Sequence, residues 1–144
     1  AIFALSNPTA RAECTAEQAY TWSGGKALFV SGSPFGRVTI NRREFRPGEG
    51  DNAYVFPGIG LGALACRARI IPDELFLAAA RTLAGLVRDR DLAQGSLYPP
   101  LRNIRRLSLA IATSVAEKAY SLKVARGKRP KNLKERIARI MYDP

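Results

Sequence analysis

The sequence predicts an α/β protein with a small parallel sheet near the N-terminus and a helical region towards the C-terminus. Two short apolar runs, at 2–5 and 27–30, flank a predicted helix at 15–21, and a strand, helix, strand order favours parallel pairing of the strands. Beyond residue 54 the apolar residues recur mainly at helical spacing. A chain of 144 residues with 47% hydrophobic residues suffices for one ordinary domain with its own core.

The first strand is expected at 2–5, a continuous apolar run that ends in the turn sequence at 6–9. A buried parallel strand needs neighbours on both sides, yet the chain starts here without an initiator methionine, so we expect a segment of a longer protein. A short helix should follow at 15–21, because Thr15 and Gln18 have the spacing of a capping box. Two glycines end this helix, and the run at 27–30 supplies the second buried strand.

Turn residues and helical periodicity predict the remaining elements. A loop is expected at 31–52, with a weak hairpin formed by 38–40 and 44–45. Two helices should follow, one at 54–66 with Pro57 in its first turn and one from 72 to 87. After a rigid break at 98–100, we expect an amphipathic helix at 104–122, a basic linker at 126–131 and a short helix at 133–141. The apolar side of the helix at 72–87 should comprise Leu75, Leu77, Ala78, Leu83, Leu86 and Val87. We expect one domain part at 1–125, followed by a basic linker and C-terminal helix at 126–144.

Composition excludes several kinds of site from this segment. The chain has no histidine, which removes histidine bases, Ser-His triads and imidazole metal ligands. Cys14 and Cys66 lack the close spacing of a metal site, so we expect both to be reduced and structural. No apolar run reaches the roughly 20 residues of a membrane helix, and no signal peptide opens the chain. We expect no membrane partner and a cytoplasmic protein, with the matrix of an organelle as the alternative.

Positive charge is concentrated in the last third of the chain. The net charge is +11, and residues 100–144 carry 12 Lys and Arg against 3 Asp and Glu. Such asymmetry favours an anionic partner, or a solvated basic face that meets an acidic surface of a larger protein. The basic stretch has no interleaved aromatic residue between Tyr120 and Tyr142, so we do not expect nucleic acid as a partner.

A glycine-rich stretch at 58–63 formally matches a dinucleotide-binding fingerprint, Gly-x-Gly-x-x-Ala. The match lacks a preceding strand and an acidic residue about 20 positions further on. The alternative is that Gly58, Gly62 and Ala65 form a small-residue face on which another element packs closely.

Two asparagines are better candidates for ligand contacts. Asn7 follows the first strand, and open parallel sheets bind ligands outside the carboxyl ends of their strands. Asn52 precedes a helix expected to begin near Ala53, where free amides and the helix dipole suit a carboxylate. From spacing alone, an Asx-turn at Asn7 and a plain N-cap at Asn52 are favoured over ligand contacts. Glu49 and Asp51 could form a carboxylate pair, although two acids in a glycine-rich loop more often form turns.

Five ordered motifs resemble those of malic enzymes, and together they span nearly the whole chain. They are Ile-Phe-Ala-Leu-Ser-Asn-Pro-Thr at 2–9, Ala-Glu-Cys-Thr-Ala-Glu-Gln-Ala-Tyr at 12–20, Ser-Gly-Ser-Pro-Phe at 31–35, Pro-Gly-Glu-Gly-Asp-Asn-Ala-Tyr-Val-Phe-Pro-Gly at 47–58 and Leu-Tyr-Pro-Pro-Leu at 97–101. The resemblance implies the C-terminal portion of such an enzyme, with part of a Rossmann-like NAD(P)-binding domain. The family is usually oligomeric and oxidatively decarboxylates malate to pyruvate and CO2 with NAD or NADP and Mg2+ or Mn2+.

The resemblance also implies roles for single residues. Asn7 would lie at malate and at the nicotinamide end of the cofactor, while Asp51 and Asn52 would lie at the substrate. The family has glutamine and asparagine where this chain has Glu49 and Asp51. An ionised Asp51 beside a dianionic substrate is repulsive unless it faces away or pairs with a cation, so substrate contact is better assigned to Asn52.

The remaining catalytic parts of the family belong to segments that precede this one. They are the metal carboxylates, the tyrosine and lysine acid/base pair, the arginine that grips malate and the main glycine fingerprint. We therefore expect no catalytic residue and no metal ligand in this chain, and an inactive isolated segment. The competing hypothesis is a stand-alone module that binds an anion or nucleic acid through its basic last third.

Overall fold

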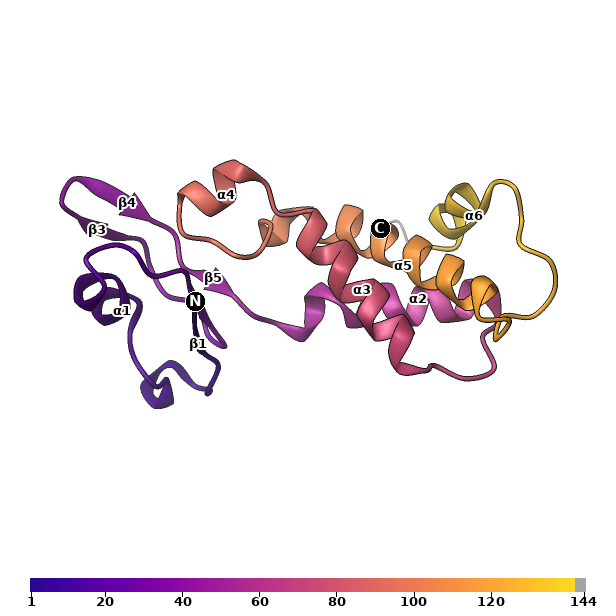
Figure 1. Ribbon diagram of the computed structural model, residues 1–144, viewed down its shortest axis with the longest axis horizontal. Coiled ribbons are helices and arrows are strands. Elements are labelled where there is room, and N and C mark those ends of the chain that lie inside the picture. The colour runs from indigo at the N-terminus through magenta and orange to yellow at the C-terminus, as the bar shows by residue number, and fades with distance from the viewer. Residues whose placement is uncertain (142–144) are drawn as a thin grey trace. The chain divides into compact units, whose positions relative to one another are not determined.

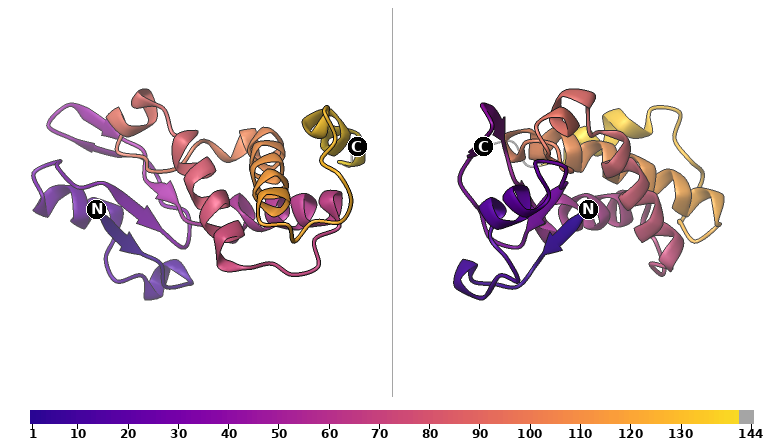
Figure 2. Two further views of the ribbon diagram at one scale, coloured as in Figure 1. Left: turned by 45° about the vertical axis from the view of Figure 1, so that its right-hand side comes forward. Right: turned by 60° about the vertical axis from the view of Figure 1, so that its left-hand side comes forward.

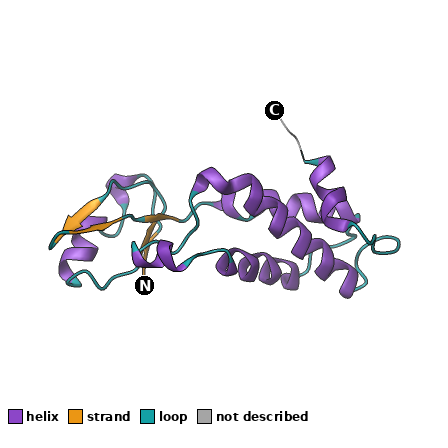
Figure 3. Cartoon of the chain, turned by 90° about the horizontal axis from the view of Figure 1, so that it is seen from above, coloured by secondary structure: helices purple, strands orange, loops and turns teal. Residues whose placement is uncertain are grey.

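Contacts in the computed structural model, which describes residues 1–141, divide the chain into two compact units. The first unit comprises 1–51 and 87–99, and the second comprises 52–86 and the chain from 100 onwards. Every strand of the described chain lies in the first unit, and the second is helical (Figures 1 and 3). The predicted α/β class with a helical C-terminal region is therefore confirmed. Residues 142–144 of the predicted segment 126–144 lie outside the described residues.

The first unit is built on a three-stranded parallel sheet in the order β1-β2-β5. Its strands are β1 (Ile2–Ala4), β2 (Phe29–Ser31) and β5 (Gly48–Glu49). Helix α1 (Ala16–Trp22) connects β1 to β2, and the predicted capping box of Thr15 and Gln18 is present. The sequence does not predict β5, because a strand of two residues is too short to show an alternation of apolar and polar residues. The burial predicted for 2–5 is wrong at Ile2, Phe3 and Leu5, which are exposed because β1 is an edge strand of this sheet.

A hairpin and a short helix complete the first unit. The predicted hairpin is confirmed as β3 (Val38–Ile40) paired antiparallel with β4 (Arg43–Phe45). Asn41 and Arg42 turn it with φ of 50° and 64°, the left-handed conformation that two-residue hairpin turns require. Helix α4 (Asp89–Ala93) has no counterpart in the sequence prediction, because five residues are too few to show helical periodicity.

Aromatic side chains join these elements into one core. The Tyr20 ring of α1 stacks on Phe45 of β4 with centroids 4.4 Å apart, and it meets Phe29 of β2 edge-on at 6.1 Å. All three side chains are buried. Burial raises the pKa of Tyr20 to about 12. Within the described chain, the Tyr20 hydroxyl has no hydrogen-bond partner.

The second unit consists of four helices: α2 (Phe56–Cys66), α3 (Asp73–Gly85), α5 (Ile104–Ser121) and α6 (Leu133–Ile140). Helix α5 packs against the other three, as the views in Figure 2 show. Its buried side chains Leu107, Ile111, Val115 and Ala119 recur at helical spacing and confirm the amphipathic helix predicted at 104–122. The apolar side predicted for α3 is partly wrong, since Leu75 and Leu83 are buried but Leu77 is half exposed. Leu77 lies about 200° around the helix from Leu75, on the opposite side.

Helix α2 contacts α5 through its glycines. A Cβ on Gly58 would lie 2.7 Å from Ile111, and a Cβ on Gly62 would lie 2.6 Å from the Ala112 carbonyl oxygen. The glycine-rich stretch thus lies inside one helix, with a 3-10 turn rather than a strand immediately before it, and Gly58 and Gly62 form the small-residue face considered above. Helix α2 begins at Phe56 rather than near Ala53, because residues 52–54 form a separate 3-10 turn. Among residues 1–141, no helix is long and apolar enough to cross a membrane.

Replacing Gly62 with alanine should lower the free energy of unfolding by about 1–3 kcal/mol, because the new methyl group would overlap the Ala112 carbonyl oxygen and crowd the Val115 side chain of α5. Gly60→Ala is the matched control within the same helix. A Cβ at position 60 would meet nothing within 4 Å, and alanine is the better helix former by about 0.5–1 kcal/mol. Urea denaturation of both variants measures the difference, and equal effects of the two substitutions would contradict the packing described here.

Replacing Tyr20 with phenylalanine should leave the free energy of unfolding unchanged or raise it slightly. The substitution removes a buried hydroxyl that has no partner in the described chain and keeps the stacked ring. Tyr20→Ala should instead lower the free energy of unfolding by about 3–5 kcal/mol, because removing the ring leaves a cavity in the core. Thermal denaturation of the two variants provides the comparison. A loss above about 1 kcal/mol for Tyr20→Phe would show that the hydroxyl is hydrogen-bonded after all.

Candidate functional site

The carboxyl ends of the three parallel strands meet at one edge of the sheet in the first unit. Asn7 comes three residues after β1, Ser33 two residues after β2, and Asp51 two residues after β5. This edge is where open parallel sheets bind their ligands. The fold therefore brings Asn7, which the sequence predicts beyond a strand end, and Asp51, which it predicts in a loop, to the same edge.

Asn7 is exposed, and one end of its side-chain amide is hydrogen-bonded within the protein. The Ser33 hydroxyl donates a hydrogen bond to Asn7 Oδ1 across 26 positions of sequence. In the described chain, the Asn7 NH2 group has no hydrogen-bond partner, so it remains able to donate. Asn7 Oδ1 accepts from the loop after β2 rather than from an amide of its own turn, so the Asx-turn alternative does not describe this residue.

The loops that follow β1 and β2 are in direct contact. The amide of Gly32 donates to the Ala4 carbonyl at 3.0 Å, which extends the parallel ladder beyond the strand ends. A Cβ on Gly32 would lie 2.3 Å from the Leu5 carbonyl oxygen and 3.0 Å from Asn7 Nδ2. Only glycine fits at this position, and its close approach places Ser33 beside Asn7.

A second contact fixes the turn that contains Asn7. The Ser6 hydroxyl donates to Glu13 Oε1 at 2.6 Å, and this hydrogen bond holds the pKa of the Glu13 carboxyl below its usual value. The Arg11 amide donates to the Pro8 carbonyl at 2.7 Å. Asn7 therefore sits in a segment that is anchored on both sides.

Asp51 and Asn52 lie where the chain passes from the first unit to the second. The Gly50 amide donates to the Ser31 carbonyl at 2.8 Å, so the chain stays paired with β2 up to this point. Both side chains are exposed, and Asp51 takes part in a further interaction. The Asn52 carbonyl accepts from the Val55 amide at 3.1 Å. Asn52 is not the N-cap of α2, because Val55 occupies that position, so the N-cap alternative is wrong for that helix.

Glu49 and Asp51, the disfavoured carboxylate pair of the sequence analysis, do not form a metal site with a third group among the described residues. Glu49 lies half-buried in β5, and Asp51 is exposed beyond its end. Among residues 1–141, no three cysteine, aspartate or glutamate side chains come together in a way that could hold a metal ion.

The sequence did not single out Ser33, Ser6 or Glu13, although the structure shows that all three hold the turn containing Asn7. A signal for Ser33 was present. It follows the second parallel strand at nearly the spacing at which Asn7 follows the first, so both belong to the same sheet edge.

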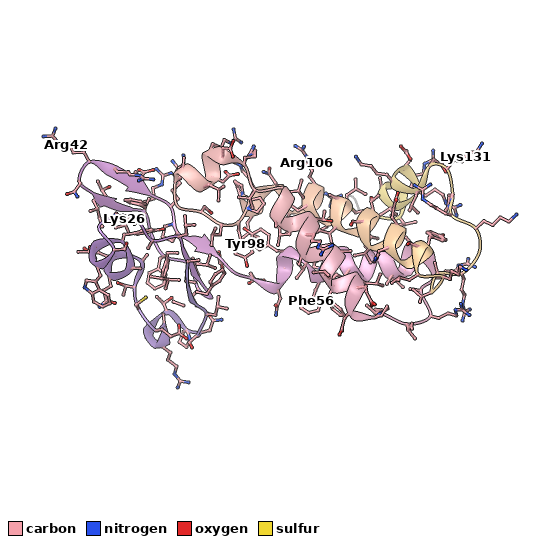
Figure 4. The ribbon with its side chains drawn as sticks, viewed as in Figure 1. Lys26, Arg42, Phe56, Tyr98, Arg106 and Lys131 are labelled. Atoms are coloured by element: carbon pink, nitrogen blue, oxygen red, sulfur yellow. The ribbon has the colours of Figure 1, made fainter. Side chains whose placement is uncertain are left out.

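A different feature lies in the second unit, where basic side chains surround a cavity of about 270 Å³. Its lining includes Arg67, Arg126, Lys128 and Arg136, with Leu133 and Ile137 among the apolar residues, and no described lining residue is acidic. The basic surface is wider than this cavity, and Figure 4 shows the side chains of Arg106 and Lys131 extending from α5 and from the loop before α6. The positive charge of the last third therefore gathers partly around one concavity.

Comparison with known proteins gives a consistent result. The family model described as "Malic enzyme, NAD binding domain" matches residues 1–120. The chain is 51% identical over 144 residues to the NADP-dependent malic enzyme of Populus trichocarpa, covering 99% of this chain and 24% of that protein. It is 47% identical over 143 residues to the corresponding enzyme of Dictyostelium discoideum, covering 99% and 26%. The chain thus spans about a quarter of the length of these relatives.

A solved structure shows the same fold. The malic enzyme from Pyrococcus horikoshii Ot3 superposes with a TM-score of 0.69 at 30% identity, covering 95% of this chain and 28% of that one. Because the family model covers most of the chain and relatives match along its whole length, this protein belongs to the malic enzyme family.

Proposed function

We propose that these residues are the C-terminal portion of a malic enzyme that oxidatively decarboxylates malate to pyruvate and CO2 with a nicotinamide cofactor. Family membership supports the reaction class, and the coverage of about a quarter of each relative supports a longer working protein. Residues 1–125 would complete the NAD(P)-binding domain, and residues 126–144 would form the basic linker and C-terminal helix. The observation that carries the proposal is the Asn7 amide, held by Ser33 at the carboxyl edge of the parallel sheet.

Asn7 is proposed to contact malate and the nicotinamide end of the cofactor. An NH2 group without a protein partner is a donor suited to a carboxylate, a hydroxyl oxygen or a carboxamide oxygen. Donors held at a sheet edge by the scaffold lose little freedom when a ligand arrives, which favours binding and orientation.

Asn52 is proposed as a second substrate contact, with Asp51 beside it in the same exposed stretch. Asn52 carries no charge and adds a donor. An aspartate carboxylate would repel dianionic malate at close range unless a cation balances it. Asp51 also takes part in an interaction of its own, so we assign it the weaker role of the two.

The metal ligands, the acid/base pair and the main cofactor fingerprint are proposed to lie outside this segment. No three metal-binding side chains gather among residues 1–141, and the chain has no histidine. Mg2+ or Mn2+ would therefore be bound by residues elsewhere in the complete enzyme. The segment alone should neither turn over malate nor bind the cofactor tightly.

Relatives help to choose among the remaining alternatives. The relatives from Populus and Dictyostelium are named NADP-dependent, which favours NADP over NAD. One Arabidopsis thaliana relative is named chloroplastic, so an organelle is an alternative to the cytoplasm. We further propose that the complete enzyme is a homo-oligomer, as is usual for the family.

A second candidate function is anion binding by the segment itself, supported by the basic cavity of the second unit. A phosphate or carboxylate would be attracted to its four basic side chains without meeting an acidic one among the described lining residues.

Asn7→Ala and Asn52→Ala, made in the full-length polypeptide, should each lower kcat/KM for malate by about 10- to 100-fold, as expected for losing a hydrogen-bond donor to a charged ligand. Asp51→Asn should change it by less than about threefold, or raise it, because it removes a repulsive charge. Steady-state kinetics with malate, NADP+ and Mn2+ measure all three. A larger loss for Asp51→Asn than for Asn52→Ala would reverse the assignment.

The intact mass of the native polypeptide, compared with the 15.7 kDa of this chain, separates the two candidate functions. A several-fold heavier product with malic enzyme activity would support the enzyme. A product near 15.7 kDa that binds a generic oligonucleotide in a salt-dependent way at physiological ionic strength would support the anion-binding module. Turnover of malate by the purified 144-residue chain would contradict the proposal that its catalytic parts lie elsewhere.

A further inference from the structure

We propose that Ser33 is a positioning residue, whose hydroxyl sets the direction in which the Asn7 amide presents its NH2 group to the ligand. The inference rests on the proposed function, because it assumes that Asn7 contacts substrate or cofactor. It adds a residue that acts through Asn7 and touches no reacting atom itself.

The first step of the argument is the chemistry of an amide. An asparagine side chain has an oxygen that accepts and a nitrogen that donates, and a half-turn of the amide exchanges the two. An exposed asparagine with no partner would present either end to a ligand. Because the Ser33 hydroxyl donates to Oδ1, the oxygen is occupied on the protein side and the nitrogen remains available.

The second step concerns which end a ligand needs. Malate and the carboxamide of a nicotinamide both present oxygen atoms that accept hydrogen bonds. The reversed amide would face a carboxylate with its own oxygen, and two acceptors repel each other. Fixing the amide therefore matters for binding a carboxylate, because only the orientation that presents the NH2 group can donate a hydrogen bond to it.

The third step is the rigidity of the support. Ser33 is half-buried and lies two residues beyond β2, the central strand of the parallel sheet. Gly32, immediately before it, lies against the Leu5 carbonyl with no room for a side chain, and its amide bonds to Ala4. The sheet itself thus positions the Ser33 hydroxyl, which links the orientation of Asn7 to the pairing of β1 with β2.

The chain offers a matched control at Ser31, which also carries a hydroxyl in the same short stretch. Ser31 is 1% exposed, and its Oγ has no hydrogen-bond partner among the described residues. Removing this hydroxyl should leave both stability and activity essentially unchanged, because no bond is lost. Ser33→Ala makes the identical chemical change where the hydroxyl does have a partner.

The experiment is a double-mutant cycle in the full-length polypeptide. Ser33→Ala should lower kcat/KM for malate by about three- to tenfold, the value of one hydrogen bond. Ser33→Thr, which keeps the hydroxyl, should restore most of the activity, and Ser31→Ala should match the unmodified enzyme. In an Asn7→Ala background, Ser33→Ala should cause no further loss, because Ser33 then has nothing to position.

Three outcomes would overturn the proposal. Independent, additive losses from Ser33→Ala and Asn7→Ala would show that Ser33 acts through another group. A lower thermal midpoint of Ser33→Ala with unchanged kcat/KM would show a structural role only. If Ser33→Ala does not fold, Ser33→Cys replaces it, because a thiol is a weaker donor, and full activity of that variant would reject the idea.

Failure of the proposed function gives a different result. If Asn7→Ala retains the kcat/KM of the unmodified enzyme, then Asn7 contacts no ligand, and both the site assignment and the role of Ser33 fall together. If Asn7→Ala is impaired and only the coupling to Ser33 is absent, the site assignment stands and this inference alone fails.

Discussion

Parallel pairing of β1 with β2 is the constraint on which the candidate site depends. In a parallel sheet, neighbouring strands end at the same edge, so side chains from distant parts of the sequence converge there without any local signal. Here that pairing brings the loop at 5–8 against the loop at 32–33. The close approach is possible because Gly32 has no side chain, and it lets a serine from one loop hold an asparagine of the other.

The second unit depends on a similar close approach between helices. Gly58 and Gly62 allow α2 to approach the backbone of α5, and larger residues would force the two helices apart. A glycine-rich stretch that matches a cofactor fingerprint in sequence therefore serves helix packing in the structure. The distinction is geometric, since the fingerprint requires a strand before its first glycine and a ligand at the helix start.

Charged residues are distributed unevenly between the sheet edge and the last third of the chain. The sheet edge carries uncharged amide and hydroxyl groups beside a few carboxylates, while the basic residues accumulate in the last third, and some of them surround a cavity of the second unit. A neutral amide donor discriminates between ligands by geometry, whereas a cluster of arginine and lysine attracts anions over a longer range. The two sites would therefore differ in their sensitivity to salt.

The sequence alone predicts those elements that are determined by residues close together in the chain. The capping box of Thr15, the hairpin at 38–45 and the apolar period of α5 all follow from residues a few positions apart, and the structure confirms them. The order of strands and turns also predicts Asn7 just beyond the carboxyl end of β1, where the structure has it. The tertiary structure alone decided which strand lies at the edge, that Gly48–Glu49 pairs with β2, and that Ser33 holds Asn7. Each of these depends on contacts between residues far apart in sequence, and no periodicity within one segment encodes them.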